Sequence, residues 1–327
     1  MNRQLFEHHS LFGYRFIPNI KARVEHESGG YLVRTNNKGF RCNHQFDDSP
    51  NNLNRRLLLF GDSFTAGDGV SNKYRYGDLI EKRIDGVEVW NYGISGTGTD
   101  QHYLIFQEFA SELDASAVII SVLVENIRRI VARFRPFVNP KGREMWLAKP
   151  YYTFDSDQLI LNQVPVPVEP FSAEDLPKNT TLDKGGRFSW FRKTLNKTGF
   201  KDFAQRITKY DPVPEYKNPN NFPWKLMSAI LEEWISNIKC QVILMPLPLY
   251  HHVEEKASPI HYIKRFRELA DRTGAIFHNP LEELTSYSLK ERRDFRFRND
   301  IHPTPKCHEV IAKSLVPVIN KIISSKT

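Results

Sequence analysis

The sequence has little cysteine and no long apolar run. Its 327 residues include three scattered thiols, Cys42, Cys240 and Cys307. An odd, sparse set without a C-x-x-C pair indicates reduced thiols and argues against a disulfide framework or a structural zinc site. No apolar run approaches the roughly 18 residues needed to cross a bilayer, and the longest, residues 117–124, has the length of a strand.

The start of the sequence does not have the pattern of a secretory signal. Residues 1–10 contain no apolar segment of the kind a signal peptide carries. If the sequence is complete, we therefore expect a cytoplasmic protein. Two adjacent histidine pairs, 8–9 and 251–252, lack the carboxylate spacing of a metal site, so no metal is expected.

Composition favours an ordinary globular protein. The apolar fraction is 40% and 22 residues are phenylalanine, which suits a packed core, while 17 glycines and 20 prolines exclude collagen-like and low-complexity classes. The formal net charge of +8 has two interpretations, an anionic substrate or a somewhat basic solvated surface. No nucleic-acid-binding module accompanies it, and no feature of the sequence reports an oligomeric state.

The pattern of apolar residues predicts an α/β fold. Strands are expected at residues 30–35, 57–60, 87–90, 117–124, 241–245 (ended by Pro246) and 274–277, and helices at 76–84, 101–113, 127–134, 224–239, 258–273 and from 305 onward. Alternating strands and helices of this spacing predict a parallel sheet. We expect a flavodoxin-like three-layer α/β/α domain with about five strands.

Proline density divides the chain. Residues 136–223 hold 11 of the 20 prolines, and proline is rare inside parallel sheets. We therefore predict an N-terminal extension (1–54), a discontinuous domain (55–135 and 223–327) and an insertion (136–222) that walls or covers a pocket. Within the insertion, residues 151–154 and 158–161 are expected to pair as a hairpin.

Four groups that can do chemistry fall at the ends of predicted elements. They are Ser63 in Gly-Asp-Ser after the first buried strand, the glycine-rich loop 91–98, Asn126, and Asp300 with His302. Singly, each has a structural explanation: a helix cap, an ordinary glycine-rich loop, a cap for the helix at 127–134, and a surface histidine. Together they supply a nucleophile, oxyanion donors and a general base with its partner.

In the order and spacing of these four blocks the sequence resembles the SGNH/GDSL hydrolase superfamily. The resemblance covers residues 57–67, 87–101, 118–126 and 299–312. It implies that Ser63 is the nucleophile, that His302 is the base, and that Ser63, Gly96 and Asn126 form the oxyanion hole. Residues 13–19 and 34–41 also resemble the leader of a subgroup of these proteins.

The sequence departs from the family pattern near the histidine. Many relatives place the aspartate three residues before the histidine, where this chain has Asn299, and Asp300 lies two before. We expect Asp300 to orient His302, with Asn299 as the alternative. His308, where a glycine-histidine pair is common, is interpreted as a packing or surface residue.

The resemblance implies hydrolysis of an ester, without a cofactor. We favour a small acyl group such as acetyl on a carbohydrate or glycoconjugate. An acyltransferase, a lipase or thioesterase, and a catalytically silent binding module are the alternatives. Two sets of residues bear on the substrate. The aromatic set either stacks on sugar rings or packs the insertion against the sheet: Trp146, Tyr151, Tyr152, Trp190 and Phe191. The arginine set either binds an anionic sugar or is solvated: Arg128, Arg129, Arg133 and Arg135.

Overall fold

The centre of the protein is a parallel sheet of five strands. The computed structural model describes residues 5–46, 55–138, 142–156, 158–177, 180–182 and 211–325. The sheet has the order β13-β12-β7-β5-β6, and all four pairings are parallel. Its strands are β5 (Arg55–Phe60), β6 (Val87–Asn91), β7 (Ala117–Leu123), β12 (Gln241–Leu247) and β13 (Ile276–Phe277). Counted along the chain, the order is 2-1-3-4-5, which confirms the flavodoxin-like prediction.

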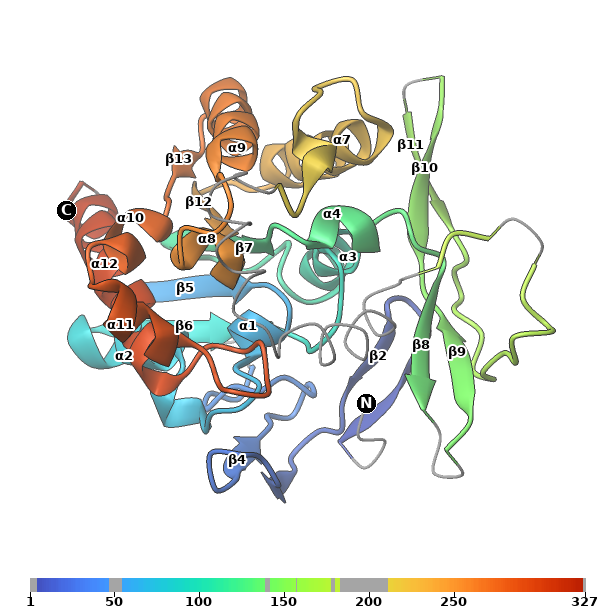
Figure 1. Ribbon diagram of the computed structural model, residues 1–327, viewed down its shortest axis with the longest axis horizontal. Helices are drawn as coiled ribbons and strands as arrows, with labels where there is room; N and C mark the ends of the chain where they lie inside the picture. The colour runs from blue at the N-terminus through green and yellow to red at the C-terminus, as the bar shows by residue number, and fades with distance from the viewer. Residues whose placement is uncertain are drawn as a thin grey trace.

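Helices cover both faces of this sheet (Figure 1). On one face α2 (Tyr76–Arg83) packs against α12 (Pro305–Ser324), and on the other α7 (Phe222–Ser236) packs between α3 (Thr99–Phe109) and α9 (Ile260–Thr273). All seven residues of β7 are buried, as expected for a strand covered on both faces. The shorter helical segments are α1 (Ser63–Ala66), η1 (Asn72–Tyr74), α4 (Asn126–Arg129), η3 (Pro214–Tyr216), α8 (Tyr250–Val253), α10 (Leu281–Thr285), α11 (Leu289–Arg292) and η4 (Arg293–Phe295).

Pro246 does not end its strand, contrary to the prediction. β12 continues to Leu247 and keeps its register with β7. The N–H of Val124 donates to the carbonyl of Leu247, and the N–H of His278 donates to that of Leu244. Backbone groups alternate in direction along a strand, so Pro246 faces the β13 side, beyond the two-residue pairing with β13. The missing N–H of proline therefore costs no ladder hydrogen bond there.

The helix expected at residues 127–134 is also wrong. α4 ends at Arg129, and β8 (Phe134–Val138) begins at the last residue of the expected helix. β8 pairs antiparallel with β9 (Glu144–Ala148). Phe134 packs with Trp146 and Val166 in a small separate cluster. The hairpin gains this burial and a cross-strand ladder, which outweigh the weak helical preference of a short segment.

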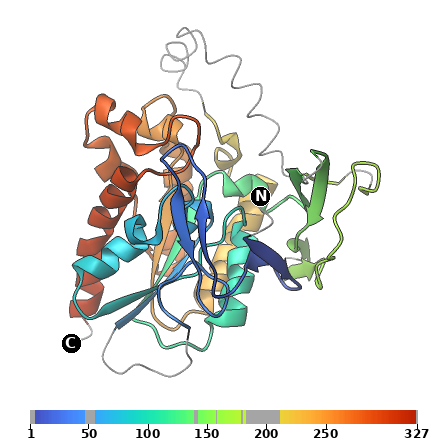
Figure 2. The ribbon, with the colours of Figure 1, turned by 90° about the horizontal axis from the view of Figure 1, so that it is seen from below.

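The remaining strands form hairpins outside the central sheet. β1 (Phe6–His9) pairs with β2 (Gly13–Phe16), β3 (Lys21–Val24) with β4 (Tyr31–Arg34), and β10 (Tyr151–Asp155) with β11 (Gln158–Asn162). The last pair confirms the predicted hairpin. Figure 2 shows β8–β11 on the side of the molecule away from α12. No helix among the described residues is long and apolar enough to span a membrane.

Candidate active site

The candidate nucleophile lies in a tight turn between β5 and α1. Asp62 caps α1 by accepting a hydrogen bond from the N–H of Phe64 at 3.0 Å. A Cβ at Gly61 would lie 2.1 Å from the hydroxyl oxygen of Thr65, so only glycine fits at this point of the turn. The turn places Ser63 at the carboxyl edge of the sheet, where open α/β folds build their sites.

Ser63, His302 and Asp300 form a continuous hydrogen-bonded chain. His302 Nε2 lies 2.9 Å from Ser63 Oγ, and His302 Nδ1 lies 2.6 Å from Asp300 Oδ1. The same carboxylate oxygen accepts the backbone N–H of His302 at 3.1 Å. Because the carboxylate can only accept, Nδ1 carries the proton and Nε2 of a neutral imidazole presents its lone pair to the serine hydroxyl. This is the geometry of a nucleophile, its general base and the base's orienting group.

The charges around His302 favour its protonated form. Burial lowers its pKa, but the hydrogen bond to Asp300 and the charges of Asp68, Asp300 and Asp62 outweigh burial, so the pKa of His302 is raised above its ordinary value of 6.5. For Asp300, burial opposes ionisation, yet its hydrogen bond to His302 and the imidazole charge hold its pKa well below the ordinary value. The pair is therefore electrostatically prepared to take a proton from Ser63.

Asp68 is a second carboxylate at the site, and it is not among the residues predicted from the sequence. Its Oδ2 lies 3.9 Å from His302 Nε2, and its Oδ1 accepts the hydroxyl of Ser95 at 2.6 Å. Asp68 directly follows Gly67, the left-handed residue that ends α1. Asp68 therefore approaches His302 from the turn that follows α1, and no local motif marks it.

The two expected oxyanion donors follow the strands on either side of β5. Gly96 lies in the loop after β6, with a φ of +80°, and Asn126 opens α4 after β7. The amide of Asn126 is fully buried, and neither its nitrogen nor its oxygen has a hydrogen-bond partner among the described residues. A buried amide without a partner lowers the stability of the fold by about 1–3 kcal/mol. Such a group is typical of a side chain that acts on a ligand.

Asn299, the alternative orienter, binds elsewhere. Its side chain donates to Glu27 Oε2 at 3.1 Å, and its backbone N–H donates to Glu27 Oε1 at 2.8 Å. His308 is fully buried, and its Nδ1 accepts the N–H of Tyr76, which agrees with the packing interpretation. Burial lowers the pKa of His308 to about 3, so it stays neutral.

The arginines after Asn126 are held by groups of the protein. Arg129 donates to Asp62 Oδ2 at 2.9 Å, and Arg128 donates to Glu215 at 2.6 Å. Arg133 lies over the ring of Tyr151, 4.8 Å from its centroid. These contacts favour neither of the two expected roles, which are binding an anionic sugar and lying solvated at the surface. Arg129 instead has a structural role as the ion-pair partner of Asp62. Arg135 donates to the Tyr14 hydroxyl at 3.3 Å.

Two of the five aromatic residues considered for sugar stacking are instead buried in the interior of the protein. Trp146 and Tyr152 are 5% and 6% exposed. Trp146 belongs to the small cluster with Phe134, and Tyr152 is stacked on Tyr103. Tyr151 is partly buried beneath Arg133. Trp190 and Phe191 lie outside the described residues.

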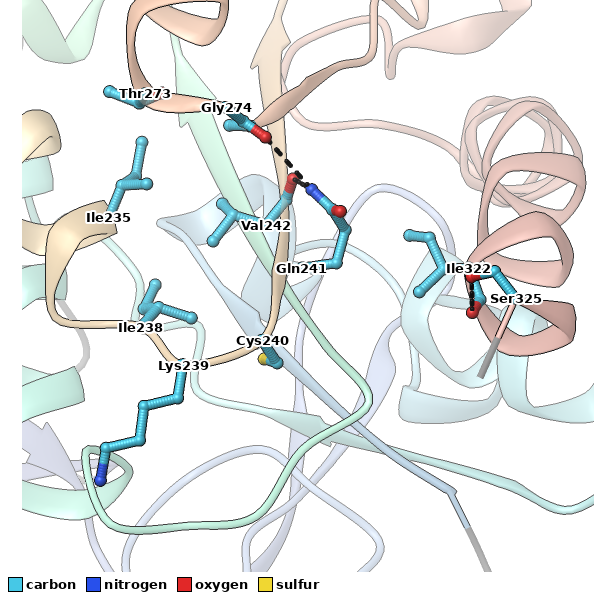
Figure 3. Close-up of a pocket in the computed structure, with 11 residues that line it drawn as sticks. Ile235, Ile238, Lys239, Cys240, Gln241, Val242, Thr273, Gly274, Ile322 and Ser325 are labelled. Carbon is cyan, nitrogen blue, oxygen red and sulfur yellow. Dashed lines mark hydrogen bonds between the residues drawn. The ribbon is translucent and has the colours of Figure 1, made fainter. Parts of the chain in front are cut away.

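A cavity of about 370 Å³ lies at the opposite edge of the sheet. It is lined by residues at the start of β12, including Gln241 and Val242, and by Ile322 of α12. Figure 3 shows Gln241 donating to the carbonyl of Gly274, with apolar side chains around it. Because β12 runs away from this cavity toward the edge of the sheet that carries Ser63, the cavity is separate from Ser63.

Several solved structures resemble this chain at low identity. A lipolytic protein of the G-D-S-L family from Veillonella parvula DSM 2008 is 13% identical, with a TM-score of 0.40 over 82% of this chain and 99% of its own. A lipase/acylhydrolase from Enterococcus faecalis is 15% identical, with a TM-score of 0.43 over 82% and 96%. A catalytic mutant of an acetylxylan esterase from Geobacillus stearothermophilus is 14% identical, with a TM-score of 0.43 over 81% and 94%.

No protein-family model matches the sequence. No curated protein matches it either.

Proposed function

We propose that this protein is a serine ester hydrolase of the SGNH type. The observation that carries the proposal is the chain of contacts from Ser63 Oγ to His302 Nε2 at 2.9 Å and from His302 Nδ1 to Asp300 Oδ1 at 2.6 Å. Residues 239 positions apart meet here, in the order that nucleophilic acyl transfer needs.

In the proposed reaction Ser63 Oγ forms a bond to the ester carbonyl carbon while His302 takes its proton. The N–H groups of Ser63 and Gly96 and the amide of Asn126 stabilise the oxyanion. The ester C–O bond then breaks, and the alcohol leaves with the proton from His302. Water attacks the acyl-enzyme with His302 again as base, which releases the acid and restores Ser63.

For the substrate we propose a short acyl group, such as acetyl, on a carbohydrate or glycoconjugate. Ser63 is only 6% exposed, so the approach to its hydroxyl suits a small acyl group better than a long chain. The proposed hydrolase uses no metal and no organic cofactor, because the serine, the base and the oxyanion donors are all protein groups.

A fluorophosphonate probe with peptide mapping tests the nucleophile. We expect the label on Ser63, and we expect Ser63→Ala to lose at least about 10⁴-fold in turnover of p-nitrophenyl acetate while melting at the wild-type temperature. Full turnover by Ser63→Ala, or labelling at another residue, would refute the proposal.

A panel of O-acetylated sugars and long-chain esters tests the substrate. Preference for long chains would reject the sugar ester and favour a lipase or thioesterase. Diversion of the acyl group to an added sugar acceptor would identify the same site as an acyltransferase. A Ser63 that neither reacts with the probe nor turns over any ester would leave a binding module.

A further inference from the structure

A histidine of the N-terminal extension reaches the candidate triad. His26 lies between β3 and β4, and its Nε2 is 3.1 Å from Asp300 Oδ2. The other oxygen of this carboxylate, Oδ1, is the one that holds His302. Asp300 therefore bridges two imidazoles, one on each oxygen, although His26 and Asp300 are 274 positions apart.

The hydrogen bonds of His26 define its tautomer. The backbone N–H of Ser28 lies 3.2 Å from His26 Nδ1, and a backbone N–H can only donate. Nδ1 of the neutral ring is therefore an acceptor, so the proton sits on Nε2 and points at Asp300. The ring is in the right form to donate without carrying a charge.

The ring of His26 is held on several sides. Its side chain is 11% exposed, and it makes edge contacts with Tyr31 and Phe297 at centroid distances of 5.7 and 4.5 Å. A Cβ at Gly69 would lie 3.3 Å from the ring and 2.6 Å from Phe297, so glycine leaves the space the ring occupies.

The neighbouring residue makes a second connection. Glu27 accepts two hydrogen bonds from Asn299, one from its backbone and one from its side chain. Two consecutive residues of the extension thus bind two consecutive residues of the loop that carries Asp300. A contact made in this way fixes the loop as well as the carboxylate.

Asp300 needs such support because its side chain is 30% exposed. A carboxylate held through one oxygen can rotate, and water competes for the other oxygen. A donor on Oδ2 fixes the plane of the carboxylate and keeps Oδ1 directed at His302 Nδ1. We propose that His26 is a positioning residue of the hydrolase, which orients Asp300 and through it the general base; this rests on the proposed function.

His26→Ala removes the donor, and His26→Gln retains an amide N–H at a similar reach. For His26→Ala we expect kcat/KM on p-nitrophenyl acetate to fall about 10-fold, which corresponds to the loss of one hydrogen bond to a charged group. We expect the change to lie more in kcat than in KM. We expect His26→Gln to recover most of this loss. Glu25→Ala, an exposed position on the same loop, is the matched control and should behave as wild type.

The pH profile separates positioning from folding. His302 faces Asp300, Asp68 and Asp62, and only its contact with Asp300 depends on His26. A loosened Asp300 should lower the pKa on the acid limb of kcat/KM in His26→Ala and return it in His26→Gln. An NMR titration of the His302 ring reports the same shift without any substrate.

Two results would overturn the inference. One is unchanged kcat/KM and an unmoved His302 pKa in His26→Ala. The other is equal loss in the alanine and glutamine variants with the acid limb unmoved, since that is damage to the fold. Ser63→Ala in the same assay distinguishes failure of the positioning role from failure of the hydrolase proposal. If Ser63→Ala is inactive while His26→Ala is fully active, only the positioning role of His26 is refuted. If Ser63→Ala is fully active, the hydrolase proposal and the positioning role are both refuted.

Discussion

Replacing Asn126 by leucine should separate activity from stability. The two residues have similar shape, but leucine brings no donor to the oxyanion. Loss of one such donor costs about 10²–10³ in rate. Asn126 is fully buried and its amide has no partner among the described residues, so the same change removes a desolvated polar group from the folded state.

The stability gain follows from the cost of that buried amide. Removing an unsatisfied amide raises the free energy of unfolding by about 1–3 kcal/mol. Imperfect packing of the new side chain lowers it by up to about 1 kcal/mol. A net gain of about 1 kcal/mol raises the melting temperature by on the order of 2 °C in a chain of this size. We therefore expect Asn126→Leu to be nearly inactive and slightly more stable than wild type.

The matched control is Asn91→Leu. Asn91 is 2% exposed, but its amide donates to the carbonyl of Thr65 at 2.9 Å and accepts the N–H of Gly93 at 2.8 Å. Its replacement leaves two buried groups without partners and should lower stability by about 2 kcal/mol or more. Calorimetric melting and kcat/KM on p-nitrophenyl acetate are measured for both variants. Asn126→Leu that keeps near-normal activity, or melts as low as Asn91→Leu, would refute the reasoning.

Three further predictions concern the same edge of the sheet. Because the base must be neutral and the pKa of His302 is raised above 6.5, kcat/KM should rise with pH through a midpoint above 6.5, and a midpoint below 6.5 in a pH–rate profile would contradict this. Gly96→Ala places a Cβ 2.0 Å from Arg135 Nη1 at a φ of +80°; we expect activity to fall about tenfold and Gly96→Ala/Arg135→Ala to recover part of it, and full activity of the single variant would contradict the model of the loop. Arg129→Leu leaves the fully buried Asp62 without its ion pair, which should cost about 3–5 kcal/mol in urea unfolding; an unchanged midpoint would show that Asp62 has other support.

The sheet was predictable because its strands are continuous apolar runs. Residues 57–60 and 117–124 predicted strands, and the structure places β5 and β7 there side by side. Where the prediction failed, tertiary context decided. Pro246 is tolerated because β13 pairs with only two residues of β12, and the length of a neighbouring strand cannot be read from the sequence around a proline.

The candidate site was predictable to the extent that it lies in short motifs. Ser63 and His302 each sit in a recognisable local pattern, and the structure brings them to 2.9 Å. The groups that surround them carry no such mark. His26 reaches Asp300, and Asp68 reaches His302, through hairpin and turn geometry that no local spacing in the sequence encodes.

The order of the contributing segments along the chain has a consequence for synthesis. The extension supplies His26, the first crossover supplies Ser63, and the loop before the last helix supplies Asp300 and His302. A growing chain that has passed position 63 holds the hydroxyl but not the imidazole, so its serine is an ordinary, unreactive alcohol. If the proposed function is right, esterolysis begins only after residue 302 has been made and the segments that carry Ser63, His26 and Asp300 have met.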